Sequence, residues 1–281
     1  MGSSKSEEAH VQGRQPGGQH GPWRRRLLVL AVLGLVGFAI YEYLTLPEAG
    51  PLLKQNPETT ALIEQRAAEA REAGRKPRRR QSWVSLSNVP KHIINAVLAS
   101  EDASFYLHEG VDTVELEKAI EDAWKEGKLG RGASTITQQL AKNLWLSTDR
   151  SLLRKAKELV LAYRLEKALP KSRILALYLN VVEWGDGVYG IEAGAREHFG
   201  VSAVNLTPAQ GAILAAMLPA PRKRSPKSGS KALKKRAHWI VEQLQAAKRL
   251  SPEQVSEAQA EIDRILSGKP AAEDTDEDDE P

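Results

Sequence analysis

The apolar residues of the chain form one long uninterrupted run and, after it, a series of shorter helical patterns. The run covers residues 27–46, LLVLAVLGLVGFAIYEYLTL. A helix of about 20 residues spans roughly 30 Å, which is the thickness of a bilayer core. The only charge in the run is Glu42, between Tyr41 and Tyr43 near its far end, where aromatic residues suit a membrane interface. The run is therefore predicted to be a transmembrane helix.

The residues before this run indicate its orientation. Arg24, Arg25 and Arg26 precede it directly, and clustered basic residues mark the cytoplasmic side of a span. A cleavable signal peptide is the alternative, but it needs a shorter apolar run and a small-x-small cleavage site, and neither is evident. We therefore predict an uncleaved signal anchor with single-pass type II topology and everything after Pro47 outside the cytoplasm.

Beyond the anchor, apolar positions recur at helical intervals, whereas the alternation expected of strands is scarce. Two start signals support this reading, the capping-box pattern Asp112-x-x-Glu115 and the sequence Thr207-Pro208. Helices are predicted over residues 58–74, 90–102, 112–126, 134–146, 151–169, 172–182, 207–218, 231–249 and 252–267. One short strand is predicted at residues 82–86. The predicted fold class is mainly α.

Composition and charge narrow the function classes. The chain has 281 residues and no cysteine, which excludes a disulfide scaffold, a thiolate nucleophile and a zinc ribbon. The formal net charge is +4, but residues 1–26 carry +3 and residues 271–281 carry −7, which leaves +8 for residues 27–270. Such a basic body indicates an anionic partner: nucleic acid, lipid phosphate or a phosphorylated substrate. Charge alone does not choose among the three.

These patterns divide the chain into four parts. We predict a basic cytoplasmic N-terminus at residues 1–26, the membrane anchor at 27–46 and an extracytoplasmic domain at 47–267. The acidic tail, residues 268–281, is expected to be disordered because its acidic run has no apolar group to bury.

Residues 132–146, GASTITQQLAKNLWL, place two kinds of side chain on one predicted helix. Ser134, Gln138 and Lys142 are four residues apart and therefore share a face. Ser134 and Thr135 stand at the helix start, where free backbone N–H groups and the dipole favour anions. A merely solvated amphipathic face is the alternative. The opposite, buried face is expected to consist of Ile136, Leu140 and Leu144.

The next predicted helix has a similar pattern. Arg150, Arg154 and Glu158 follow at four-residue steps. An ordinary surface pair between Arg154 and Glu158 is the alternative to a functional site, and such a pair contributes a few tenths of a kcal/mol. The apolar side of this helix is expected to comprise Leu152, Leu153, Ala156, Leu159 and Val160.

Two further motifs contain residue types that could carry chemistry. Glu101 and Asp102 end a predicted helix beside Phe105, and a carboxylate near aromatic rings can have the raised pKa that a general acid or base needs near neutral pH. A simply solvated pair is the alternative. Residues 185–190, GDGVYG, match G-x-G-x-x-G literally, but they follow a helical segment rather than a strand. They are predicted to form a glycine-rich turn between helices.

Taken together, these segments resemble the peptidoglycan glycosyltransferases of glycosyltransferase family 51, in the form without a penicillin-binding domain. The resemblance covers about residues 45–250. Five segments carry it in the family's order: Glu101-Asp102-x-x-Phe105-x-x-His108-x-Gly110, Gly132 to Gln139 with Lys142-Asn143, Arg154-Lys155-x-x-Glu158, Leu177-Tyr178-Leu179-Asn180 continuing through Glu183 to Ile191 and Phe199-Gly200, and Leu206-Thr207 through Leu214 to Pro221.

The resemblance implies a lysozyme-like glycosyltransferase anchored in the bacterial cytoplasmic (inner) membrane, with lipid II as its substrate. The lipid-linked growing strand is the donor, and the 4-hydroxyl of the acceptor N-acetylglucosamine attacks it with inversion and release of undecaprenyl pyrophosphate. The expected partners are lipid II, the nascent glycan strand, the membrane and candidate proteins of the division or elongation machinery, with no nucleic acid.

The family pattern also assigns roles to residues. Glu101 is expected to be the catalytic base, because a sugar hydroxyl is a poor nucleophile and must lose its proton. Glu158 is the second catalytic glutamate, and it either orients the surrounding cations or acts at the donor pyrophosphate. No cofactor is certain; a divalent cation, Mg²⁺ or Mn²⁺, at the pyrophosphate is a candidate. The expected substrate-binding residues are Asp102, Ser134, Thr135, Gln138, Gln139, Lys142, Arg150, Arg154 and Lys155.

Some positions depart from the family pattern. Ala133 replaces a common second glycine, His198 replaces a tyrosine, and residues 222–225 replace a tyrosine-containing segment. Two other functions are alternatives to the polymerase: a muramidase-like lytic enzyme on the same fold and a non-catalytic membrane-anchored scaffold. The lytic enzyme needs no pyrophosphate cradle, and a degenerate scaffold would have been favoured by loss of Glu101 or of the Ser-Thr-Gln-Gln segment.

Overall fold

The computed structural model describes residues 22–126, 134–149 and 151–267, and the chain divides into two units, residues 1–46 and 47–281. The first unit contains helix α1 (Pro22–Thr45), whose side chains are largely exposed. Within the described residues, one apolar segment at Arg25–Leu53 is long and apolar enough to cross a membrane, with a mean hydropathy of 2.2. The predicted tail at 268–281 and residues 1–21 of the predicted N-terminus lie outside the described residues.

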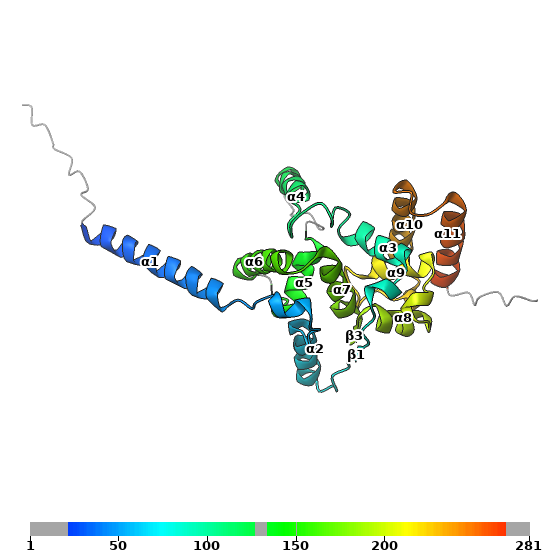
Figure 1. Ribbon diagram of the computed structural model, residues 1–281, viewed down its shortest axis with the longest axis horizontal. Coiled ribbons are helices and arrows are strands. Elements are labelled where there is room, and N and C mark those ends of the chain that lie inside the picture. The colour runs from blue at the N-terminus through cyan, green and yellow to red at the C-terminus, as the bar shows by residue number, and fades with distance from the viewer. Residues whose placement is uncertain (1–21, 127–133, 150, 268–281) are drawn as a thin grey trace, which may run out of the picture. The chain divides into compact units, whose positions relative to one another are not determined.

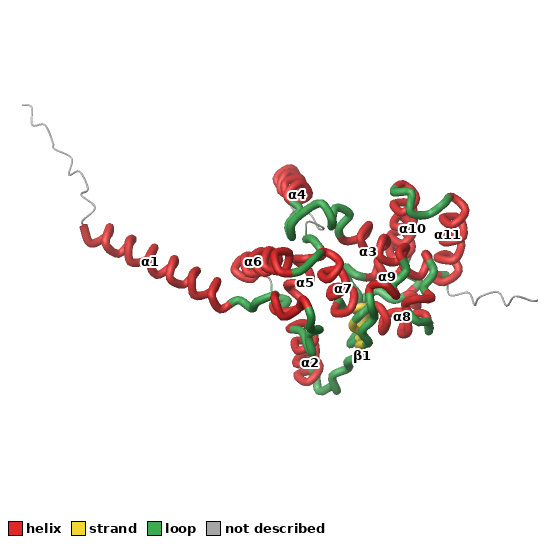
Figure 2. The backbone as a smooth tube through the Cα atoms, in the orientation of Figure 1, coloured by secondary structure: helices red, strands yellow, loops and turns green. Residues whose placement is uncertain are grey.

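The second unit is built almost entirely of helices (Figures 1 and 2). Short 3-10 turns occur at η1 (Gly50–Leu53), η2 (Leu86–Asn88), η3 (Ala203–Asn205) and η4 (Pro226–Ser228). The predicted mainly α fold class is confirmed, while its lysozyme-like character stays a prediction. The α-helices are α2 (Ala61–Glu72), α3 (Lys91–Glu101), α4 (Thr113–Glu126), α5 (Ile136–Trp145), α6 (Leu152–Ala168), α7 (Lys171–Val181), α8 (Ile191–Phe199), α9 (Pro208–Met217), α10 (Lys231–Ala246) and α11 (Pro252–Leu266).

Two groups of helices make the core. In one group, α9 packs against α3, α10 and α11; in the other, α5 packs against α2, α6 and α7. Helix α9 is buried over nearly its whole length, which suits its almost purely apolar sequence. Gly211 allows α9 to approach α3 closely, because a Cβ at this position would collide with the Ile93 side chain. Because α3 ends at Glu101, its close packing against α9 fixes the position of Glu101.

A small three-stranded sheet has the order β1-β3-β2, formed by β1 (Arg80–Gln81), β2 (Glu183–Gly185) and β3 (Val188–Tyr189). β1 is parallel to β3, and β2 is antiparallel to β3. The strand predicted at 82–86 is therefore wrong: the chain pairs at residues 80–81 and then turns into η2.

The sheet also corrects the reading of residues 185–190. They form the hairpin between β2 and β3 rather than a turn between helices. Gly187 has φ +68°, and a Cβ there would press on the backbone of Arg78, so the tight turn requires glycine. Helix α8 follows directly and was not predicted. Its short length and the glycines on both sides hid its periodicity.

The helices predicted after residue 47 exist, with ends that differ from the structure by up to three residues. The predicted buried face of α5 is confirmed, since Ile136, Leu140 and Leu144 are all buried. For α6 the prediction is wrong, because none of the five residues on the expected apolar side is buried. Leu152, Leu153 and Leu159 are exposed, whereas Glu158 is buried. The buried face of α6 is the one that packs against neighbouring helices, and in this protein that face carries the Glu158 carboxylate.

Candidate active site

A cleft of 910 Å³ opens beside the C-terminal end of α3. The end of α3 and the connection to α4 form one wall of the cleft, from Ala99 to Glu115. Ser134 and Thr135, at the start of α5, and Trp239 of α10 also line it. The segments that meet here are far apart in the sequence, and the packing of α3 against α10 brings two of them together.

Glu101 is the last residue of α3 and lines this cleft. Its carboxylate accepts hydrogen bonds from Ser100 Oγ at 3.1 Å and from Gln139 Nε2 at 3.0 Å. The Tyr178 hydroxyl donates to Gln139 Oε1 at 3.0 Å, so the amide presents its N–H group to the glutamate. Burial raises the pKa of Glu101, and these two hydrogen bonds oppose the rise. A carboxyl group with a raised pKa is suited to proton transfer nearer neutral pH.

Asp102 is buried and joins the two sides of the cleft. It accepts a hydrogen bond from the backbone N–H of Ile136 at 2.9 Å and contacts His108 Nε2 at 2.9 Å. The first of these contacts satisfies a free N–H group at the start of α5. Asp102 therefore fixes the start of α5 beside the end of α3, next to Glu101.

Two predicted substrate-binding residues, Thr135 and Gln138, are used in the N-terminal cap of α5. Thr135 Oγ1 accepts from the Gln138 backbone N–H at 3.2 Å, and Gln138 Oε1 accepts from the Thr135 backbone N–H at 2.9 Å. Thr135 Oγ1 also donates to the carbonyl of Gly110 at 2.6 Å. Both side chains are buried, and the reciprocal bonds form a capping box. The described contacts of these two residues thus fix the backbone around Ser134.

A second cluster surrounds Glu158, which is 3% exposed in the middle of α6. Arg154 Nη1 lies 2.6 Å from its Oε2 atom, and the Lys155 ammonium group pairs with its other oxygen. Lys155 also donates to Ser134 Oγ at 3.1 Å, so this cluster reaches the lining of the cleft. Burial lowers the pKa of Lys142, and the charge of Glu158 opposes that change.

Three cations therefore share a single neighbouring carboxylate, with Glu101 a weaker influence on Lys142. The Nε group of Arg154 is buried and has no hydrogen-bond partner among the described residues. An excess of positive charge with a free N–H donor is suited to an anion such as a phosphate group. The structure thus brings together Ser134, Gln139, Lys142, Arg154 and Lys155 with the two glutamates. The predicted Arg150 lies outside the described residues.

The described residues do not form a metal site held by the protein. No group of three His, Asp or Glu side chains gathers in residues 22–126, 134–149 and 151–267. Both oxygens of Glu158 are already paired with cations. A divalent cation at the candidate pyrophosphate position would have to take most of its ligands from the substrate.

Sequence reasoning assigned no role to several residues of this site. Tyr178 was noted only as part of a motif, and nothing in the sequence shows that its hydroxyl orients Gln139. Ser100, Arg236 and Trp239 were not singled out at all. Arg236 and Trp239 are three residues apart on an amphipathic helix, a spacing that also occurs on ordinary helix surfaces.

Comparison with known proteins gives the class of this protein. Residues 67–245 match the family model described as Transglycosylase, which is more than half of the chain. The chain therefore belongs to the transglycosylase family and is a transglycosylase enzyme. The resemblance to peptidoglycan glycosyltransferases, drawn above from five motifs, is confirmed.

Relatives in this family are similar over most of the chain. The biosynthetic peptidoglycan transglycosylase of Janthinobacterium sp. (strain Marseille) is 41% identical over 221 residues, covering 79% of this chain and 94% of the relative. The protein of the same name from Bordetella pertussis is 48% identical over 172 residues, covering 60% of this chain and 71% of its own.

Solved structures were matched too. Penicillin-Binding Protein 1A from Haemophilus influenzae is 22% identical with a TM-score of 0.37, covering 64% of this chain and 17% of that much longer one.

Proposed function

We propose that this transglycosylase polymerises the glycan strands of peptidoglycan from lipid II. The acceptor 4-hydroxyl oxygen forms a bond to C1 of the donor N-acetylmuramic acid. The bond from C1 to the pyrophosphate oxygen breaks, the configuration at C1 inverts, and undecaprenyl pyrophosphate leaves with the bonding electrons. The observation that carries this proposal is the pairing of a half-buried glutamate at a cleft with a nearby cluster of cations.

Glu101 takes the proton of the attacking hydroxyl. Its raised pKa, its place at the cleft and its fixed orientation between Ser100 and Gln139 all support this role. The nearby cations Arg236 and Lys142 favour the ionised form, which is the form that accepts a proton.

The leaving pyrophosphate gains negative charge as the bond breaks, and fixed cations stabilise such a charge without reorganising. Lys142, Lys155 and Arg154 supply these cations. Glu158 holds Arg154 and Lys155 from the buried side, so we assign it to the orientation of the pyrophosphate-binding groups. Ser134 contacts Lys155 and lines the cleft with Glu101, so phosphate or sugar oxygens at Ser134 would lie between Glu101 and the cluster around Glu158.

Helix α1 anchors the enzyme to the membrane that contains its lipid-linked substrate. Its length and composition support a membrane span, and Arg24 to Arg26 support a type II orientation with the enzymatic domain outside the cytoplasm. Deletion of residues 1–46 should leave a folded domain with lower activity on lipid II in liposomes. Equal activity would contradict a role of the anchor in access to substrate.

The test of the proposed function uses the purified full chain with lipid II in detergent, with products resolved by gel before and after muramidase digestion. Wild type should form a muramidase-sensitive polymer. Glu101→Gln should reduce the rate by about 10²–10⁴-fold, the usual contribution of a general base, while circular dichroism shows an unchanged helical domain.

Two outcomes would replace this proposal. Release of soluble muropeptides from finished cell wall, without polymer from lipid II, would indicate a lytic enzyme. A folded wild-type protein that does neither would indicate a scaffold. Unchanged polymerisation by Glu101→Gln would remove Glu101 from the role of base but not the polymerase itself.

A further inference from the structure

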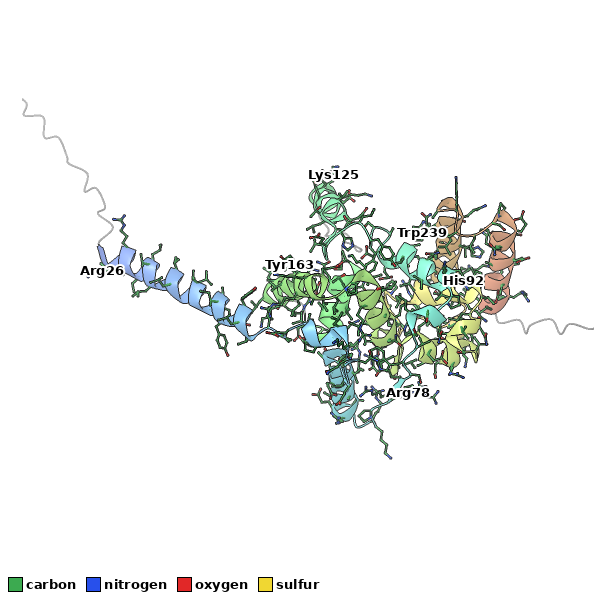
Figure 3. The ribbon with its side chains drawn as sticks, in the orientation of Figure 1. Arg26, Arg78, His92, Lys125, Tyr163 and Trp239 are labelled. Atoms are coloured by element: carbon green, nitrogen blue, oxygen red, sulfur yellow. The ribbon has the colours of Figure 1, made fainter. Side chains whose placement is uncertain are left out.

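Trp239 is a large aromatic side chain on the wall of the catalytic cleft. It lies on α10, where α10 packs against α3, and Figure 3 shows it beside the α3 ribbon. It is 37% exposed and lines the same 910 Å³ cleft as Glu101 and Asp102. An aromatic surface left exposed at a functional cleft is available to a ligand.

The ring of Trp239 is held in place from one side. The guanidinium carbon of Arg236 lies 4.1 Å from the ring centroid, which is a cation–π contact. Arg236 in turn donates a hydrogen bond to the carbonyl of Ser100 at 3.0 Å, so the indole is tied to the residue next to Glu101. The exposed part of the Trp239 side chain, 37% of its surface, contributes to the lining of the cleft.

We propose that Trp239 is the platform on which the acceptor sugar stacks while its 4-hydroxyl faces Glu101. This proposal rests on the function proposed above and adds a positioning residue to it. The pyranose ring has an apolar face of C–H groups with hydroxyl groups around its edge. A ligand of this kind needs a flat apolar surface next to hydrogen-bonding groups, and Trp239, Glu101 and Ser100 line one cleft in that combination.

The polar surroundings favour a sugar over the lipid chain of the substrate. An isoprenoid chain would bury the Glu101 and Asp102 carboxylates against hydrocarbon, which is costly for charged groups. The apolar side chains Leu107 and Val114 are strongly exposed and line the cleft too, so the lipid has other surface to contact. Trp239 and Arg236 lie on α10, and Glu101 lies at the end of α3. A sugar bound between them can stack its apolar face on Trp239 and direct the hydroxyl groups of its edge to the polar side chains.

A direct binding test uses the indole N–H signals of the full chain in detergent, labelled with ¹⁵N-tryptophan. The chain has six tryptophans, and the signal of Trp239 is assigned by its loss in Trp239→Phe. The probes are the disaccharide N-acetylglucosaminyl-N-acetylmuramic acid and, separately, farnesyl phosphate. We expect the disaccharide to shift the Trp239 signal in a saturable manner, while the signal of Trp83, outside the cleft, does not move. No shift with the disaccharide, or a shift with farnesyl phosphate alone, would overturn the proposal.

A kinetic test separates positioning from folding. Trp239→Leu removes the flat surface and should raise KM for lipid II about tenfold, which corresponds to about 1.4 kcal/mol, with a much smaller change in kcat. Trp239→Phe keeps a ring and should recover most of the loss. Trp83→Leu is the matched control, because Trp83 lines surface hollows away from Glu101, and its KM should equal that of wild type.

The outcomes also distinguish this proposal from the function on which it rests. If wild type makes no polymer, the proposed function fails, and the indole spectra still show whether the disaccharide binds at Trp239. If wild type polymerises lipid II and Trp239→Leu retains the wild-type KM, the platform is overturned while the polymerase stands.

Discussion

Glu101 is half-buried at the cleft and Glu158 is buried on α6, and the fold gives the two glutamates opposite surroundings. Glu101 faces two neutral donors, Ser100 and Gln139, with its cations further away, and burial raises its pKa. Glu158 is in direct contact with Arg154 and Lys155 on its own helix. The first environment favours a carboxyl group that exchanges a proton. The second favours one that holds two cations in place.

The comparison shows that residue type does not determine role. Both glutamates lie in segments that the sequence predicts to be helical, and both are expected from the sequence to be catalytic. The difference arises from which helix face is buried and from what the facing helix supplies. For Glu101 the facing helix supplies an amide oriented by Tyr178, whereas for Glu158 its own helix supplies two charges one turn away.

The largest expected effect on stability comes from Glu158→Gln. Removal of its charge leaves Arg154, Lys155 and Lys142 without their neighbouring carboxylate, and loss of one partner of a buried ion pair costs about 3 kcal/mol. Urea unfolding should show this loss in the free energy of unfolding. Glu197→Gln is the control, because Glu197 also pairs with two arginines, Arg78 and Arg80, but near the surface. It should cost less than about 1 kcal/mol. Equal costs would contradict the contrast between buried and exposed clusters.

A smaller effect of opposite sign is expected from Glu101→Gln. The fold disfavours the ionised form of Glu101, so the neutral variant should be more stable than wild type at pH 7, by about 0.5–2 kcal/mol. The gain should develop as pH rises above the ordinary glutamate value of 4.5, because the unfolded chain then ionises first. Below that pH both states are protonated, and the two proteins should unfold with the same free energy. A variant less stable than wild type at pH 7 would contradict this account.

The smallest effect concerns the pH dependence of activity. Ser100→Ala removes a hydrogen bond that lowers the pKa of Glu101, so that pKa should rise further. The base must be ionised, and the acid limb of kcat/KM should therefore move to higher pH by less than about one unit. Activity on the high-pH plateau should be retained. If the acid limb stays in place or moves to lower pH, the ionisation of Glu101 does not determine that limb.

Parts of the site follow from local sequence patterns. Asp112 caps α4 as its spacing predicts, and the hydroxyl of Thr135 marks the start of α5. Arg154 and Glu158 are one helical turn apart, so their contact requires only that the segment be helical. Gln138 and Gln139 could not be distinguished in this way. Only the orientation of α5 decides that Gln138 closes the cap while Gln139 reaches Glu101.

The sequence by itself determined the apolar membrane-length segment, the helical character of the domain and the family, because these depend on local periodicity and on ordered motifs. Only the tertiary structure decided that Glu158 is buried while Leu152 is exposed, that Tyr178 orients Gln139, and that Trp239 meets Glu101 at one cleft. Those relations join side chains from different helices. They depend on how the helices pack against one another, and the period of a single helix contains no information about its neighbours.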